Sequence, residues 1–232
     1  MTSRPALVFD TDGTLLDARA AVVDAVAAGL AETYGHFGLP TPPPDRARVA
    51  GAIGLPSGSY YRSAFPPGSV PAALIDDFAA EFELRSTRAE VAALHAGATD
   101  LYPGAEQTLA ALVARGHPLL LMSNAGSLYF DTVVAVHGLW RYFGRTLSLE
   151  EAARRGWARD KRGVVRRLLA GAGAAVVIGD RAHDVEAGRA AGARTVGCLY
   201  GFGGPAELAG ADWRVGSLPE LLELPLHRSN AG

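Results

Sequence analysis

The sequence predicts an α/β protein with a doubly wound, mostly parallel sheet and an inserted all-helical domain. From about residue 98 onward, short apolar runs alternate with helical patterns, and such repeated units form parallel sheets covered on both faces. Residues 18–97, in contrast, hold helical patterns and a Pro-rich break but no convincing strand. We therefore expect a sheet domain of residues 1–17 and 98–232, interrupted by a helical domain of residues 18–97.

The first part of the chain contains one predicted strand followed by helices. The apolar run of residues 6–9 is typical of a buried strand. The Pro-rich segment 40–44 and the Gly-Leu-Pro turn within 53–56 break the chain between helical patterns. Apolar residues spaced three or four apart predict the helices, which cover 20–34, 45–52 and, as one helix or two, 70–95.

After residue 101 the predicted elements alternate between helix and strand. Each predicted strand is short and apolar, as in strands buried on both faces. The predicted strands cover 118–123, 146–149 (the weakest), 174–180 and 195–199. The predicted helices cover 105–115, 127–137, 161–170 and 182–191.

Composition excludes several kinds of protein. The 232 residues, 49% of them apolar, suit one domain with a sizeable insertion. A net charge of -2 gives no basic surface for nucleic acid. The one cysteine, Cys198, cannot form an intramolecular disulfide, and the longest apolar runs are too short to span a membrane. We expect a cytoplasmic protein with neither nucleic-acid nor membrane partners; its oligomeric state stays open.

Two carboxylates, Asp10 and Asp12, come directly after the first predicted strand. A buried strand cannot enclose unpaired carboxylates, so the pair is expected at the strand end, next to a cation. A hairpin is disfavoured because a helical pattern follows Asp17, and a calcium loop because Gly13 stands fourth rather than sixth. Such a pair can bind a metal ion and attack phosphorus.

Polar residues also follow two later strands. Ser123 and Asn124 end one, and Asp180 ends another, with Asp184 one helical turn later. Each of these alone could be a helix cap, but ligands of parallel sheets bind beyond the carboxyl ends of the strands. Lys161 is also conspicuous, because the 21 other members of the Lys and Arg set are arginines. Arginine cannot replace lysine where a compact positive charge must lie beside a phosphate and a carboxylate.

In chain order these motifs resemble those of the haloacid dehalogenase-like hydrolase superfamily. The four matching segments are Asp10-Thr11-Asp12-Gly13-Thr14, Ser123-Asn124, Lys161 and Gly179-Asp180-Arg181-Ala182-His183-Asp184. Segments 53–56, 101–104 and 192–203 look like its phosphoglycolate-phosphatase-like group. Arg162 departs from the Lys-Pro found in many relatives, and Arg181 replaces a small residue. The resemblance implies a Rossmann-like core with a mobile helical cap.

The resemblance also implies a magnesium-dependent phosphatase that hydrolyses a small phosphorylated metabolite through an aspartyl-phosphate intermediate. Asp10 would be the nucleophile and Asp12 the general acid and base. Mg²⁺ would be held by the Asp10 carboxylate, the Asp12 backbone carbonyl and Asp180. Asp184 would orient Lys161 or a water on the metal. The implied phosphate-binding residues are Gly13, Ser123, Asn124 and Lys161.

Several activities remain open on this core. A nucleotidase, a pyrophosphatase or a phosphosugar mutase would use the same residues, and a receiver-like or non-catalytic phosphate-binding protein would share part of them. Specificity is expected to come from the helical insertion. Its candidate residues are Arg48, Tyr60, Tyr61 and Arg62, each of which also fits a role in packing or on a solvated helix face.

Overall fold

A six-stranded parallel sheet forms the centre of the protein, for which a computed structural model describes residues 4–226. The strands are β1 (Ala6–Phe9), β4 (Leu119–Ser123), β5 (Arg145–Ser148), β6 (Ala175–Gly179), β7 (Arg194–Cys198) and β8 (Trp213–Val215). They lie in the order β5-β4-β1-β6-β7-β8, and every neighbouring pair is parallel. The chain therefore winds outward from β1 to β5, then returns to build the other half from β6.

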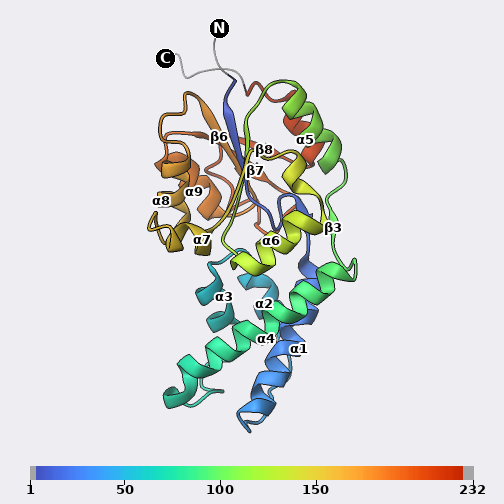
Figure 1. The fold of residues 1–232 in the computed structure, drawn as a ribbon, viewed down its shortest axis with the longest axis vertical. Helices are drawn as coiled ribbons and strands as arrows, with labels where there is room; N and C mark the ends of the chain where they lie inside the picture. The colour runs from blue at the N-terminus through green and yellow to red at the C-terminus, as the bar shows by residue number, and fades with distance from the viewer. Residues whose placement is uncertain (1–3, 227–232) are drawn as a thin grey trace.

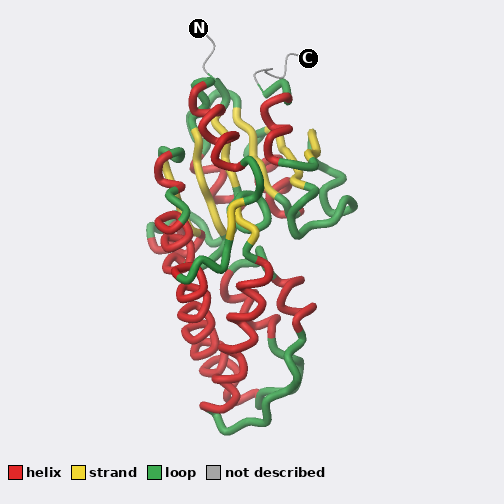
Figure 2. The backbone as a smooth tube through the Cα atoms, turned by 90° about the vertical axis from the view of Figure 1, so that its right-hand side faces the viewer, coloured by secondary structure: helices red, strands yellow, loops and turns green. Residues whose placement is uncertain are grey.

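Both faces of this sheet are covered, as the alternation of side chains along β1 illustrates. Leu7 and Phe9 belong to an apolar cluster with residues of α5 (Ala105–Ala114) and α6 (Ser127–Val136). Val8 points to the opposite face and packs with residues of α7 (Leu149–Arg154), α8 (Lys161–Leu168) and α9 (Ala182–Ala190). Figures 1 and 2 show these helices on either side of the strands. The predicted doubly wound fold is confirmed.

Four helices lie beyond the carboxyl ends of the strands and form a separate unit in the lower half of Figure 1. They are α1 (Arg19–His36), α2 (Arg46–Ala52), α3 (Ser57–Ala64) and α4 (Ile75–His95). The long helices α1 and α4 run side by side, and aromatic rings of Tyr34, Phe65, Phe78 and Phe82 pack between these elements. We call residues 18–97 the cap; these boundaries remain a prediction.

A short antiparallel ribbon joins the cap to the sheet domain. Its strands, β2 (Leu16–Asp17) and β3 (Asp100–Leu101), lie where the chain leaves the sheet domain and where it returns. In Figure 2 this ribbon is the yellow pair between the two parts. Both connections of the chain between the cap and the sheet domain pass through this ribbon.

The structure departs from the predicted elements where capping or short length decides the outcome. The strand expected to end at residue 149 stops at Ser148, because the Ser148 hydroxyl accepts a hydrogen bond from the Glu151 N–H (3.0 Å) and starts α7. Helix α3, strand β8 and the β2–β3 ribbon were not predicted. Three short 3₁₀ helices complete the chain: η1 (Ala72–Leu74), η2 (Leu139–Arg141) and η3 (Leu218–Glu223).

Two further predictions concern the chain as a whole. Within residues 4–226, no helix combines the length and apolar character needed to cross a bilayer. The outer ends of the predicted sheet domain, residues 1–3 and 227–232, lie outside the described residues.

Candidate active site

The candidate site begins at the carboxyl end of β1, where the winding of the sheet reverses direction. The Asp10 N–H continues the β1–β6 ladder by donating to the Ile178 carbonyl (2.9 Å). The Thr11 carbonyl then accepts hydrogen bonds from the N–H groups of residues 14–16. This turn fixes the backbone that carries Asp10 and Asp12 over the end of the sheet.

Gly13 makes this turn possible. Its φ of +81° lies in the left-handed region, and a Cβ atom there would lie only 2.3 Å from Asp180 Oδ2. No residue with a side chain fits without displacing Asp180. Gly13 therefore allows Asp180 to lie against the turn. The predicted contact of Gly13 with phosphate stays a prediction.

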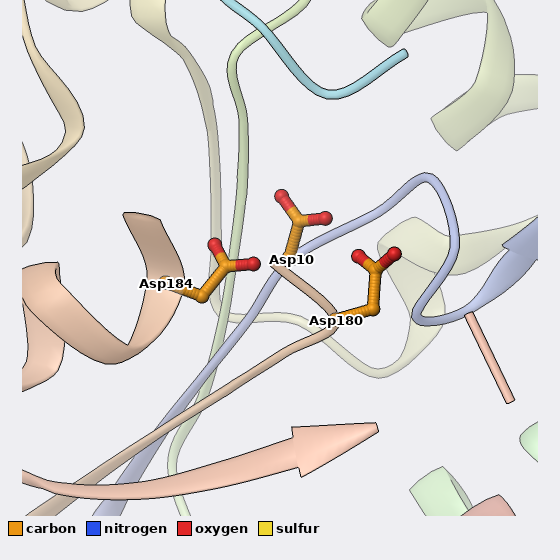
Figure 3. A group of neighbouring side chains, drawn as sticks. All are labelled: Asp10, Asp180 and Asp184. Atoms are coloured by element: carbon orange, nitrogen blue, oxygen red, sulfur yellow. The ribbon is translucent and has the colours of Figure 1, made fainter. Parts of the chain in front are cut away.

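Three buried carboxylates converge beside this turn, those of Asp10, Asp180 and Asp184 (Figure 3). One oxygen from each lies within 4.8 Å of the others, and none of the three residues is more than 6% exposed. Asp180, after β6, accepts from the Phe202 N–H (2.6 Å). Asp184, in the first turn of α9, accepts from the Arg181 N–H (3.0 Å). Backbone amides thus fix two of the three.

The ammonium of Lys161 lies among these carboxylates. It contacts Asp10 Oδ1 and lies 2.5 Å from Asp184 Oδ1, and the side chain is 4% exposed. Helix α8 begins at this residue because the Asp160 carboxylate caps it by accepting from the Gly163 N–H (2.7 Å). Lys161 is therefore buried within the cluster and is not a solvated surface residue.

Carboxylates outnumber ammonium groups in this cluster, and the pKa values of the three aspartates differ accordingly. Burial raises the pKa of Asp10 well above its usual range, although Lys161 opposes that rise. Burial, followed by the charge of Asp184, raises the pKa of Asp180 to about 7. Burial acts to raise the pKa of Asp184, but Lys161, His183 and the hydrogen bond from the Arg181 N–H together lower it. Three carboxylates share one ammonium, so the cluster is short of positive charge.

This arrangement fits a small divalent cation. The converging groups are carboxylate oxygens, the ligands that hard cations prefer, and they are buried with an excess of negative charge. Among hydrogen bonds of the described residues, none is donated to the Asp12 carbonyl oxygen, which leaves that oxygen available as a further ligand. Asp184 belongs to the acidic cluster itself as well as contacting Lys161.

Asp12 lies apart from the cluster and is held by a residue that the sequence did not reveal. Its Oδ1 accepts a hydrogen bond from the Tyr129 hydroxyl (2.7 Å). Burial raises the pKa of Asp12 to about 6, while the bond from Tyr129 acts in the opposite direction. The sequence placed Tyr129 only within a helix. The signal available was its position in the first turn after the polar strand end.

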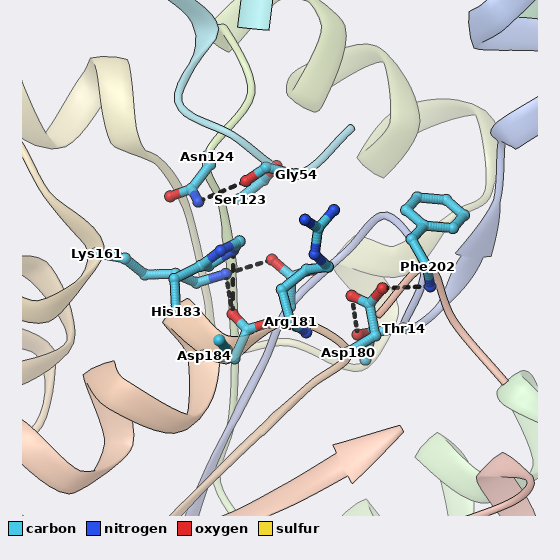
Figure 4. Close-up of polar contacts among 12 residues, drawn as sticks. Thr14, Gly54, Ser123, Asn124, Lys161, Asp180, Arg181, His183, Asp184 and Phe202 are labelled. Carbon is cyan, nitrogen blue, oxygen red and sulfur yellow. Dashed lines mark hydrogen bonds and ion pairs between the residues drawn. The ribbon is translucent and has the colours of Figure 1, made fainter. Parts of the chain in front are cut away.

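Ser123 and Asn124 end the neighbouring strand β4 and are both buried. The Ser123 hydroxyl accepts from the Ala125 N–H (3.1 Å), and Asn124 Nδ2 donates to the Gly54 carbonyl of the cap (2.8 Å). Arg181 reaches the same cap turn by donating to the Ile53 carbonyl (2.6 Å). Two core side chains therefore hold the cap against the strand ends, and Figure 4 shows the contact of Asn124 with Gly54.

A cavity with about 550 Å³ of empty space, part of it open to solvent, lies between the cap and the strand ends. Asp10, Asp12 and Ser123 line its core side, and Tyr60, Tyr61 and Glu90 line its cap side. The prediction that Tyr60 and Tyr61 face the site agrees with this lining.

The two predicted arginines lie elsewhere. Arg48 pairs with Asp45 (3.3 Å) and Arg62 with Asp76 (2.5 Å), on the exposed surface of the cap. The expectation that they line the site is wrong.

Glu90 was missed by the sequence analysis, although its spacing carries a signal. It follows Phe78, Phe82 and Ser86 at intervals of four along α4, and all four residues are buried. An acidic residue on the buried stripe of a helix is uncommon unless it is paired or functional.

Comparison with known proteins agrees with this geometry. A family model described as haloacid dehalogenase-like hydrolase matches residues 5–192. The chain is 31% identical to a plasmid phosphoglycolate phosphatase of Cupriavidus necator, with 93% of this chain and 90% of that protein covered. It is 27% identical to a 5'-nucleotidase of Pseudomonas aeruginosa, covering 88% and 86%. A haloacid dehalogenase-like family hydrolase structure from Streptococcus pneumoniae shares the fold, with a TM-score of 0.72, 21% identity and coverage of 96% and 99%.

Gly13→Ala tests the role of the turn. The variant should lose stability through both the left-handed backbone and the collision with Asp180, by about 2 kcal/mol or more. Gly38→Ala is the matched control, because Gly38 has a φ of +64° but nothing within 4 Å of its added Cβ. Urea unfolding measures both. Equal losses in the two variants would contradict a specific contact with Asp180.

Lys161→Met tests the buried ammonium. Removing one partner of a buried ion pair costs about 3 kcal/mol or more, so the unfolding free energy near pH 7 should fall by that amount. Arg162→Met, at the exposed neighbour that pairs with Glu186 at 3.5 Å, should change stability by about 0.5 kcal/mol or less. If Lys161→Met were as mild as its neighbour in thermal and urea unfolding, Lys161 would not balance this cluster.

Proposed function

Since the chain belongs to the haloacid dehalogenase-like hydrolase family, we propose that its site hydrolyses small phosphomonoesters through a phosphorylated Asp10. The observation that carries this proposal is the contact of buried Lys161 with Asp10 and Asp184 at the end of β1. Asp12 follows the same strand end and lines the same cavity as Asp10. Similarity over most of the chain to proteins named phosphoglycolate phosphatase and 5'-nucleotidase supports a phosphate ester as substrate.

In the first step an Asp10 carboxylate oxygen attacks phosphorus. An O–P bond to Asp10 forms as the O–P bond to the alcohol breaks. Asp12 gives its proton to the departing alkoxide, which leaves as the alcohol. The raised pKa of Asp12, about 6, supports this role because an appreciable fraction of its carboxyl groups is protonated near pH 6. Tyr129 holds one Asp12 oxygen and leaves the other for the proton.

In the second step water attacks the phosphorus of the aspartyl-phosphate. Asp12, now a carboxylate, accepts the proton of that water, and Asp10 departs with its bonding electrons. Inorganic phosphate is released and both aspartates return to their starting states. The same carboxyl thus acts first as acid and then as base, and its single hydrogen bond to Tyr129 serves both steps.

The approach of an anionic phosphate to Asp10 requires positive charge nearby. Lys161 supplies one charge, and we propose that Mg²⁺, held by Asp10, Asp180 and the Asp12 carbonyl, would supply the remainder by neutralising the phosphoryl oxygens. The Ser123 hydroxyl lies on the same cavity and would donate to those oxygens. Asp184 positions Lys161, which it contacts directly.

Nucleotidase, pyrophosphatase and phosphosugar mutase activities would employ the same core. They differ in the group that the cap side of the cavity must admit. We propose that the cap closes over the bound phosphomonoester, with Asn124 and Arg181 holding the turn at residues 53–54.

Asp10→Asn should reduce hydrolysis of an aryl phosphate by about three orders of magnitude or more, because an amide is not a nucleophile toward phosphorus. The fold should persist, since the volume hardly changes. Asp17→Asn, an exposed residue at the end of β2, serves as the matched control and should keep full turnover. Near-normal turnover of purified Asp10→Asn would exclude Asp10 as the nucleophile.

Magnesium should raise the melting temperature more at pH 8 than at pH 6. With its pKa raised from 3.8 to about 7, Asp180 contributes less to stability as the pH rises from about 4 to 7. At pH 6 it is still mostly protonated, so a cation must displace its proton, whereas at pH 8 it is ionised. A cation offsets this loss by favouring the ionised form. At about 100 times its dissociation constant the gain is about 2.7 kcal/mol, or several degrees.

Asp180→Asn should abolish this shift, whereas Asp77→Asn, at an exposed position in α4, should retain it. The measurement is a thermal melt with Mg²⁺ and with EDTA at both pH values. A shift that is the same at pH 6 and pH 8, or that survives in Asp180→Asn, would place the cation elsewhere.

A further inference from the structure

The cap side of the cavity carries an acidic group and no basic one. Among the described residues that line the cavity there is no Lys, Arg or His. Its acidic lining residues are Glu90 of the cap and Asp10 and Asp12 of the core. The cap contains six arginines, but five of them are engaged outside the cavity and Arg88 is exposed. The engaged ones are Arg19 at the Gly201 carbonyl, Arg46 with Asp24, Arg48 with Asp45, Arg62 with Asp76 and Arg85 with Glu81.

Glu90 is 5% exposed and has no cationic partner among the described residues. Its Oε2 accepts a hydrogen bond from the Tyr61 hydroxyl (3.1 Å), and in residues 4–226 no hydrogen bond reaches Oε1. Burial raises the pKa of Glu90 to about 8, because its surroundings disfavour the carboxylate. A buried carboxyl without a cation is costly unless a ligand supplies one.

Three tyrosines line the cavity that this carboxyl also lines. They are Tyr60, Tyr61 and Tyr129, and the rings of Tyr60 and Tyr61 lie 4.9 Å apart between centroids. The Tyr60 hydroxyl is buried and has no hydrogen-bond partner in the described part of the chain. Aromatic faces beside a carboxylate are the surroundings in which proteins bind ammonium groups, because the ring quadrupole and the anion both attract the cation.

We propose that the cap side of this cavity binds an ammonium group, so that the substrate is the phosphomonoester of a small amino alcohol. The inference rests on the proposed phosphatase function. The phosphate would lie at Asp10 and Ser123, and the ammonium would lie between Glu90 and the tyrosine rings. A substrate with a carboxylate at that end would meet Glu90 without any neutralising side chain. The chain would then differ in substrate from the phosphoglycolate phosphatases that it resembles.

Three two-carbon phosphates isolate the charge of the distal group. Aminoethyl phosphate, hydroxyethyl phosphate and 2-phosphoglycolate have the same phosphate and chain length but end in a cation, a neutral hydroxyl and an anion. The ratio of kcat/KM values in the wild-type enzyme should favour the amine over the hydroxyl by about 30-fold or more, the low end of the effect of a buried charge pair. The carboxylate should be the poorest substrate.

Variants assign this preference to Glu90. Glu90→Gln should remove most of the amine-to-hydroxyl ratio, and the ratio cancels any general damage to the phosphate site. Glu81→Gln makes the same chemical change on the same helix outside the cavity, where Glu81 pairs with Arg85 at 2.6 Å, and should leave the ratio unchanged. Tyr60→Phe, which removes only the unpartnered hydroxyl, should lower the ratio less than Glu90→Gln.

The outcomes separate the two proposals. The ammonium site would be overturned, and the phosphatase left intact, if the wild-type enzyme hydrolysed 2-phosphoglycolate or hydroxyethyl phosphate as fast as the amine. The same holds if it hydrolysed an aryl phosphate but showed no preference among the three two-carbon phosphates. An unchanged ratio in folded Glu90→Gln would also overturn it. Failure to hydrolyse all three and the aryl phosphate would overturn the phosphatase function, and this inference with it.

Discussion

Three carboxylates, those of Asp10, Asp180 and Asp184, lie within 4.8 Å of one another where little water screens their repulsion. The Lys161 ammonium contacts two of them. His183 also lies beside the cluster, with its Nε2 at 3.8 Å from Asp184 Oδ1, and burial lowers the pKa of that imidazole. The position of Lys161 depends on several separate parts of the chain: the end of β1, the capped start of α8 and the first turn of α9. The glycine turn at residue 13 then brings Asp180 against the backbone that follows Asp10.

The incomplete balance of charge in this cluster connects the fold to the proposed chemistry. A fully neutralised site would bind neither a cation nor a phosphate strongly. In the proposed function, the residual negative charge would attract a divalent cation, and the cation and Lys161 together would bind the phosphate. Asp12 lies outside the cluster, so burial and Tyr129, rather than Lys161, dominate its pKa. These separate surroundings support the different tasks that we propose for the two aspartates.

Much of the core could be predicted from the sequence because its signals are local. The apolar run before Asp10, the polar residues after two later strands and the lone lysine each stand in a few consecutive positions, and parallel pairing brings such strand ends to one edge. Glu90 and Tyr129 could not be assigned in the same way. Each lies within a helix, and only the packing of the cap on the sheet domain brings both to the cavity of Asp12. Arg48 and Arg62 failed as candidates because nearby aspartates pair with them on the surface.

In the proposed mechanism the phosphoryl group is transferred to Asp10 before it reaches water. Asp12→Asn retains the nucleophile but cannot activate the water, so an aryl phosphate with a good leaving group should phosphorylate this variant and leave it phosphorylated. Rapid quenching followed by mass spectrometry of the peptide that contains Asp10 measures this directly. The account predicts a phosphoryl adduct on Asp10, present in Asp12→Asn and absent from the Asp10→Asn, Asp12→Asn double variant. Release of the aryl group by Asp12→Asn with stoichiometric free phosphate and no adduct at Asp10 would contradict it.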